Sequence, residues 1–325
     1  MSRSIIVMLL CCSVASSAQT PASSSVAPSV EQLIAGRRLD EAKTAIDAML
    51  ARNGSDPYAL YLMGRLVYAQ GNTGTAVDWF EKAVDRDDNV SIYHVWLANA
   101  VGDEAQKASK FRQPFLARRV RKEFERAVQL DPSSVPGRQG LVDFYSIAPG
   151  IMGGDMNKAR QQAQELLKLS PMRGHYAMSR IAERQKDTVT AEKELRETVA
   201  VQPDSTFGYA NLAAFYRRHA RWDEAFATWD ALIKARPDLV AAHANWGIYS
   251  AISGTRYERG ERELKQYLEH VPPDASPATV SAVRYRLGQI YEKTGRASQA
   301  RAEYNEAIKI SPQNQDAKKA LAALK

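Results

Sequence analysis

The residues best suited to catalysis or metal binding are dispersed along this sequence. No two of its five histidines are spaced so that both would lie on one face of a helix, as a zinc site built on a helix requires. No Gly-x-Ser-x-Gly motif marks a nucleophile, and the acidic residues are spread over faces expected to be solvated. We therefore predict no catalytic residue, metal site or cofactor; an enzyme whose site is assembled across several helices stays as an alternative. The histidines, all expected to act singly, are His94, His175, His219, His243 and His270.

A glycine-rich stretch, SIAPGIMGGDMNKA at residues 146–159, has the composition of a phosphate-binding loop. No strand-like segment precedes it and no Gly-Lys-Ser/Thr follows it, so the phosphate-loop motif is incomplete. Pro149 should end one helix, and Asp155 or Asn157 can cap the next. We expect residues 148–156 to form a longer turn. A partner-binding loop is the alternative, because Ile151 and Met152 would be exposed there.

Positive charge is concentrated in residues 107–126, which hold eight basic and two acidic residues. Pro114 can stand in the first turn of a helix, and residues 116, 120, 124 and 127 would then form its buried stripe. The basic side chains would mostly point outward, either as a solvated face or as a contact for an acidic partner, anionic lipid or glycan. Nucleic acid is not expected, because the aromatic residues do not alternate with the basic ones as a single-strand platform requires. The predicted basic surface comprises Lys107, Lys110, Arg112, Arg118, Arg119, Arg121, Lys122 and Arg126.

Residues 1–18 have the layout of a cleavable secretory signal: a positively charged start, an apolar run and then small residues. The run is shorter than the roughly 20 residues that a membrane-spanning helix needs. Both cysteines, Cys11 and Cys12, lie in it, so the chain after Ala18 could form no disulfide, which fits the bacterial periplasm. Secretion and a lipid anchor on one of these cysteines are the alternatives. Residues 19–29 are small and polar, and we expect them to be a disordered linker.

From Val30 onward the apolar residues recur three and four apart, and no segment alternates like a strand. Prolines punctuate the chain at intervals of about one helix pair; Pro203 and Pro237, for example, are 34 residues apart. The sequence thus predicts an all-α solenoid over residues 30–325, whose repeat units end near 54, 88, 132, 171, 203, 237, 272 and 312. Residues 315–325 would form a terminal helix that covers the end of the stack. In the last unit, Gly288 lets the two helices approach each other, and Gly295 can adopt a positive φ at the turn.

The recurring small and aromatic positions resemble the tetratricopeptide repeat, a helix-turn-helix of 34 residues. They include Leu62, Gly64, Ala76, Phe80 and Ala83 in one unit, with Gly288, Ala300, Tyr304 and Ala307 in another. The resemblance covers nearly the whole chain after Val30, and it implies a right-handed superhelical solenoid of about eight repeats with a C-terminal capping helix. Residues 93–132 also resemble exported bacterial tetratricopeptide proteins and, more distantly, the helical domain of the eukaryotic regulators of microtubule dynamics.

This resemblance implies a concave face, lined by the first helix of each repeat, that binds proteins or peptides. The carboxylate clamp of the chaperone-binding members is incomplete, because Val95 and Gly140 replace two of its polar residues while Asn99 keeps one. Four arginines, at positions 180, 184, 217 and 218, are expected to converge beside Tyr176 on a patch that binds an acidic segment. The residues that the resemblance places in the groove are rich in Tyr and Arg: Tyr58, Tyr61, Arg65, Tyr68, Asn99, Asp143, Arg173, Tyr176, Arg180, Arg184, Arg217, Arg218, Tyr285 and Gln289.

The function expected from these observations is that of a periplasmic scaffold or adaptor, with a role in envelope assembly. It would bind partner proteins or peptides, some of them acidic, through the concave face. The alternative is peripheral binding of anionic lipid or glycan through residues 107–126. We expect neither a nucleic acid nor a small-molecule substrate as partner.

Overall fold

The computed structural model describes residues 28–273 and 275–324. Within these ranges the chain forms seventeen α-helices and one short 3-10 helix, without a strand. The expected signal sequence, Cys11, Cys12 and most of the expected linker lie outside the described residues. Ser29 is described, and its side chain caps the first helix in a capping box with Gln32.

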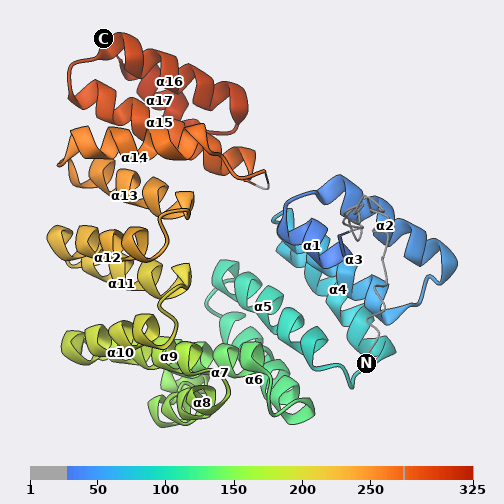
Figure 1. Ribbon diagram of the computed structural model, residues 1–325. Helices are drawn as coiled ribbons and strands as arrows, with labels where there is room; N and C mark the ends of the chain where they lie inside the picture. Colours follow the sequence, from blue (N-terminus) through green and yellow to red (C-terminus); the bar gives the residue numbers. More distant parts are fainter. Residues whose placement is uncertain (1–27, 274, 325) are drawn as a thin grey trace, which may run out of the picture.

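The helices follow one another as antiparallel pairs in the order of the chain (Figure 1). Each of the eight pairs comprises a first and a second helix, and a seventeenth helix packs on the last pair. The opening pair is the least regular, because α1 has only six residues. The pairs are α1 (Val30–Ala35) with α2 (Leu39–Arg52), α3 (Pro57–Ala69) with α4 (Thr73–Arg86), α5 (Ser91–Lys107) with α6 (Gln113–Leu130), α7 (Val135–Ile147) with α8 (Met156–Leu169), α9 (Pro171–Arg184) with α10 (Thr188–Val201), α11 (Thr206–Arg218) with α12 (Trp222–Ala235), α13 (Val240–Ser253) with α14 (Tyr257–Glu269), and α15 (Pro277–Lys293) with α16 (Ala297–Ile310); the last helix is α17 (Gln315–Ala323).

Small residues set how closely the two helices of a pair approach. A Cβ atom added at Gly288 in α15 would lie 2.5 Å from the ring of Tyr304 in α16, which is nearer than real Cβ contacts come. A similar contact joins two neighbouring pairs, because a Cβ atom added at Gly140 in α7 would lie 2.2 Å from the ring of Phe124 in α6. In both cases a glycine on one helix makes room for an aromatic ring, so the ring can be buried without a cavity. Gly295 has a φ of 77° and makes the turn between α15 and α16.

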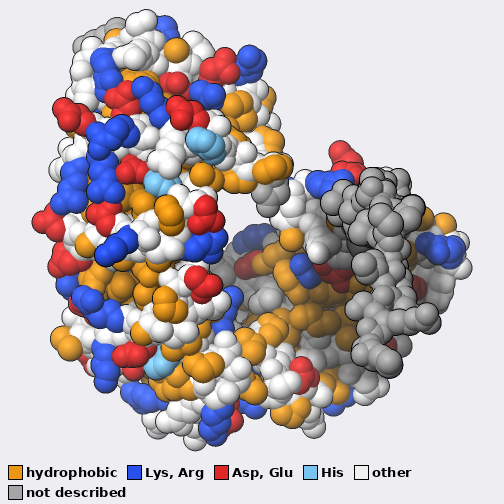
Figure 2. Space-filling model, viewed as in Figure 1, with side chains coloured by type: hydrophobic (Ala, Val, Ile, Leu, Met, Phe, Trp, Pro, Cys, Tyr) orange, Lys and Arg blue, Asp and Glu red, His pale blue; other side chains and the backbone are white. Residues whose placement is uncertain are grey.

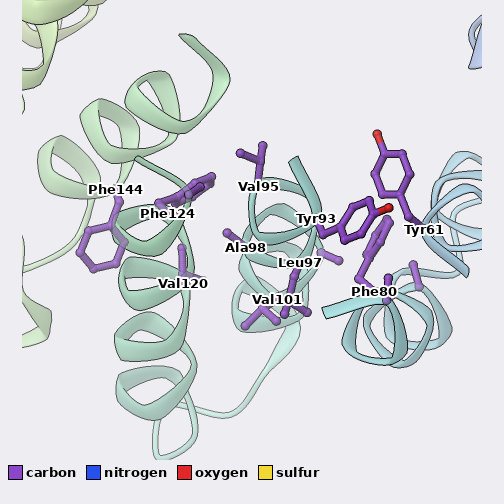
Figure 3. Packing of buried hydrophobic residues seen from close by; sticks show 14 of the residues in the cluster. Tyr61, Phe80, Tyr93, Val95, Leu97, Ala98, Val101, Val120, Phe124 and Phe144 are labelled. Atoms are coloured by element: carbon purple, nitrogen blue, oxygen red, sulfur yellow. The ribbon is translucent and has the colours of Figure 1, made fainter. Parts of the chain in front are cut away.

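The core runs along the stack between the helices and consists of aliphatic and aromatic side chains. Figure 3 shows part of it, where Phe80, Tyr93, Val120 and Phe124 from successive helices are packed among their neighbours. Such burial is the main stabilising term for a chain of this kind. Among the described residues, none of the helices has the length and apolar content to cross a membrane.

The first helices of neighbouring pairs contact each other, as α3 does with α5, α5 with α7 and α7 with α9. Contacts between successive second helices are fewer, so the stack curves with the first helices on its inner side. Figure 1 shows the curved stack, and Figure 2 shows the hollow that its two arms enclose. The predicted all-α repeat solenoid is therefore confirmed.

Two connections depart from the regular pattern. Helices α5 and α6 have 17 and 18 residues, whereas α7 and α8 have 13 and 14. Between α7 and α8 the chain forms the 3-10 helix η1 (Gly150–Met152), which lies against α6. Helix α7 ends at Ile147, just before Pro149, and the side chain of Asp155 caps α8 by accepting hydrogen bonds from two backbone N–H groups.

Candidate binding groove

A polar hollow lies on the inner side of the solenoid where α5, α7 and α9 meet. It has a volume of about 360 Å³, and its polar lining consists of Asn99, Gln139, Asp143 and Arg173. Asn99 and Asp143 also line a neighbouring, mostly apolar hollow of about 390 Å³ that reaches α6 and the α7–α8 connection. Three residues that the sequence placed in the groove, one on each of three successive first helices, are thus brought together.

Asp143 faces two arginines of α9. Burial raises the pKa of its carboxyl group, while Gln139 and the charges of Arg180 and Arg184 act in the opposite direction. The pKa of Arg184 is lowered by its burial and then by the charge of Arg180. Arg180 and Arg184 therefore lie close to Asp143, beside the polar hollow rather than in its lining, and the carboxylate of Glu183 also acts on Arg184.

Several polar atoms of this cluster have no protein partner. The Nε atom of Arg184 and the Oε1 atom of Gln139 are buried without a hydrogen bond. Arg180 forms no salt bridge with a carboxylate among the described residues. Because an unpaired buried polar atom costs free energy, such atoms suit a ligand that supplies the missing partners.

Arg173 and Tyr176 on α9 pack against α11. The guanidinium carbon of Arg173 lies 4.2 Å from the ring centre of Phe207, a cation–π contact. The ring of Tyr176 meets Phe207 edge-on, with 5.0 Å between the ring centres. We call Arg173, Arg180 and Arg184, together with Gln139 and Asp143, the arginine patch.

Arg217 and Arg218 are engaged elsewhere. Arg218 forms a salt bridge of 2.5 Å with Glu183, a residue of α9. Arg217 lies close to Tyr249 of α13: burial raises the pKa of that tyrosine, and the charge of Arg217 acts to lower it. The four arginines expected to converge are thus divided: Arg180 and Arg184 act on Asp143, whereas Arg218 pairs with Glu183 and Arg217 acts on Tyr249.

The predicted groove residues of α3 form a separate group, whose polar atoms and rings contact one another and residues of α5. Tyr61 is only 4% exposed and stacks on Tyr93, so its expected place on the groove surface is wrong: packing against α5 buries the ring. Arg65 donates a hydrogen bond of 2.8 Å to the Tyr61 hydroxyl and lies 3.8 Å from the ring centre of Trp96. Tyr68 donates a hydrogen bond of 2.6 Å to Asp103.

Two further aromatic groups lie at the ends of the stack. Tyr58 is exposed and hydrogen-bonded to Glu31 of α1. At the other end, Gln289 donates a hydrogen bond of 2.9 Å to the hydroxyl of Tyr285 on the same helix. Neither group lines the polar hollow between α5, α7 and α9.

The basic residues of the segment 107–126 fall into two sets. Four of them, Lys107, Arg119, Arg121 and Arg126, form salt bridges with nearby carboxylates. The other four form no salt bridge among the described residues. These unpaired cations are Lys110, Arg112, Arg118 and Lys122.

Three histidines hold helix pairs together. The Nδ1 atom of His94 lies 2.7 Å from Glu123, that of His175 lies 2.8 Å from Glu194, and His243 pairs in the same way with Glu263. In each pair the histidine is on a first helix and the glutamate on the second helix of the same unit. Over the described part of the chain, no cluster of three potential metal ligands occurs.

Sequence reasoning missed Gln139 and Phe207. Gln139 stands four residues before Asp143, so the two share a face of α7. This spacing could have indicated a polar pair in the groove. Phe207 stands just before Gly208 at the start of α11, and its role depends on the approach of Arg173 from α9, which no local pattern indicates.

Eight stacked helix pairs with an inner face of first helices define the chain as a helical-repeat scaffold. Residues 32–91 match one family model described as tetratricopeptide repeat, and residues 281–314 match another. The chain thus carries tetratricopeptide repeats toward both ends of its helical stack, and such repeats serve in general as scaffolds for protein interactions. No curated protein matches the sequence.

The solved structure of yeast Tom70 agrees with this fold. The structure of yeast Tom70 matches over 89% of this chain, with a TM-score of 0.66 and 13% sequence identity. This chain covers 58% of that Tom70 chain. A tetratricopeptide repeat protein from Parabacteroides merdae matches over 82% of this chain and 97% of its own, with a TM-score of 0.45 and 14% identity. At such identity, the likeness to Tom70 shows the fold alone.

Proposed function

We propose that this protein is an exported scaffold that binds an acidic segment of a partner protein in the arginine patch. The proposal rests on two buried atoms without a hydrogen-bond partner, Nε of Arg184 and Oε1 of Gln139. Arg180, whose charge acts on Arg184, forms no salt bridge among the described residues. A carboxylate could accept hydrogen bonds from both arginines, whose forked donors match its two oxygen atoms. The Gln139 carbonyl oxygen could accept from a backbone N–H of the same segment.

The geometry favours an extended peptide over a compact ligand. The polar hollow and the apolar hollow beside it share Asn99, Gly140 and Asp143, so together they form a continuous surface across α5, α7 and α9. An extended segment could place an apolar side chain in the apolar hollow, cross the polar hollow and bring an acidic side chain against Arg180 and Arg184.

The test is binding of two labelled octapeptides, one alternating Glu and Ala and the other Lys and Ala, measured by fluorescence anisotropy. The chain without residues 1–18 keeps every described residue, so it serves as the protein. We expect the acidic peptide to bind and the variant Arg180→Glu/Arg184→Glu to bind it at least tenfold more weakly. Two lost contacts of roughly 1 kcal/mol each suffice for that change.

The control variant is Lys193→Glu/Lys234→Glu, which makes the same charge change at exposed positions of the second helices α10 and α12. It should bind the acidic peptide within about twofold of the unmodified chain. Equal affinities of the arginine and lysine variants would refute the proposed site.

The proposed location is the periplasm, with partners in the cell envelope. It rests on the signal-like layout of residues 1–18 and on the lack of cysteine in the rest of the chain. Intact-mass measurement of the protein from the periplasmic fraction should give a chain that begins near Gln19. A mass that includes an acyl group on Cys11 or Cys12 would contradict it.

A further inference from the structure

The connection between α5 and α6 presents two aromatic rings to solvent. Phe111 is 89% exposed and Phe115 is 71% exposed, although phenylalanine is normally buried. We call residues 108–118 the α5–α6 tip. Helices α5 and α6 are about four residues longer than those of the next pair, so at 1.5 Å per residue each extends roughly 6 Å farther.

The unpaired cations of the basic segment gather at and next to this tip. Lys110 and Arg112 flank Phe111 in the sequence, and Arg118 lies three residues after Phe115. Phe115, Arg118 and Lys122 share the outward face of α6, because they are spaced three and four apart on the side opposite the buried Val120 and Phe124.

Two of the paired cations are held away from the tip. Arg119 is bound to Glu81 at 2.5 Å and Arg126 to Asp88 at 3.5 Å, both on the α4 side. The hydrogen bonds that Thr73 and Lys107 donate to the carboxylate of Glu104 are the larger causes that lower its pKa, and the charge of Arg112 contributes less. The free positive charge therefore lies around the two rings.

Hydrogen bonds hold the tip in a defined shape. The backbone N–H groups of Arg112 and Gln113 both donate to the carbonyl of Ser109, at 2.9 and 3.1 Å. The Gln113 side chain donates to the carbonyl of Ala108 at 3.2 Å, and the guanidinium carbon of Arg118 lies 5.9 Å from the Phe115 ring centre. Binding would thus cost little ordering of the backbone.

We propose that the α5–α6 tip docks on the surface of an anionic phospholipid bilayer. The rings of Phe111 and Phe115 would enter the boundary between headgroups and acyl chains, while the four unpaired cations contact lipid phosphates. Charge complementarity and the projecting position of the tip favour a broad anionic surface over a pocket of a partner protein. The proposal does not depend on the arginine patch, which lies on α7 and α9.

The test is sedimentation with vesicles of phosphatidylcholine alone or with 30% phosphatidylglycerol, at low and high salt, using the chain without residues 1–18. We expect binding only to the anionic vesicles, weakened by salt. Phe111→Ser/Phe115→Ser should bind at least tenfold more weakly at the same net charge. The control is Val189→Ser, which removes a side chain 80% exposed on α10 and should leave binding unchanged.

A second pair of variants tests the charges. Lys110→Glu/Arg112→Glu should weaken binding by at least about thirtyfold, since each cation near an anionic membrane contributes about fivefold. Lys193→Glu/Lys234→Glu is the matched control and should lose much less. The proposal is overturned if the unmodified chain ignores anionic vesicles at low salt, or if the phenylalanine variant binds them as well as Val189→Ser does.

Discussion

Replacing Gly288 with alanine should destabilise the protein, whereas the same replacement at Gly102 should stabilise it. Both glycines stand five residues before the end of a first helix, in α15 and α5. Their surroundings differ. A Cβ atom at Gly288 would lie 2.5 Å from the fully buried ring of Tyr304, but at Gly102 it would meet only Val120, at 3.8 Å.

The comparison isolates the cost of overpacking. Alanine in a helix interior is favoured over glycine by about 1 kcal/mol, and this gain applies to both variants. An extra methyl group in a filled core costs about 1 to 3 kcal/mol. At Gly288 the displaced ring of Tyr304 would also strain its hydrogen bond of 2.6 Å to Glu292. The two variants should therefore differ by about 1 to 3 kcal/mol in free energy of unfolding, with Gly288→Ala the less stable.

Urea unfolding followed by circular dichroism measures the difference. Hydrogen exchange then shows which helices are destabilised, because a repeat protein can open locally. Exchange in Gly288→Ala should rise in α15, α16 and α17 and stay unchanged in α3 to α5. If the two variants are equally stable, the close contact between Gly288 and Tyr304 does not make alanine unfavourable at position 288.

Two predictions concern pH. Burial lowers the pKa of His94, but its hydrogen bonds to Glu123 and to a backbone carbonyl outweigh burial and hold the pKa above 6.5. The stability that protonated His94 contributes is complete below pH 6.5 and is lost as pH rises through the folded-state pKa. The difference in unfolding free energy between the unmodified chain and His94→Gln should therefore shrink from pH 6 to pH 8.5. A gap that is constant or widens with pH would contradict this charge assignment. The hydrogen bond from Arg221 is the main cause that lowers the pKa of Glu192 to about 2, so its contribution is present above pH 4.5 and lost as pH falls toward 2. Glu192→Gln should flatten the fall in unfolding free energy between pH 4.5 and 2.5, and an unchanged slope would count against the Arg221 contact.

The repeat architecture could be predicted because its signals are local. The spacing of apolar residues gives the helices, prolines mark the connections, and Gly288 and Tyr304 stand in one unit. The capping of α8 by Asp155 and the positive φ of Gly295 follow from residue chemistry within a few positions. Each is decided by neighbours in the sequence.

The candidate site was predictable only in part. Asn99, Asp143 and Arg173 were assigned to the groove through the repeat register, and they line one hollow. The same register assigned Tyr61 to the groove, where stacking on Tyr93 of the next unit buries it. Register tells which face of a helix a residue occupies, but the residue of the neighbouring repeat decides whether that face stays open.

The sequence by itself determined the helical-repeat class and the positive charge of residues 107–126. Only the tertiary structure decided which charges are free. Arg218 meets Glu183, 35 positions away, and Arg119 meets Glu81, whereas Arg180 and Lys110 meet no carboxylate in a salt bridge among the described residues. The physical reason is that charge pairing depends on distances of a few ångströms between helices of different repeats, and these distances are set by how the helices pack.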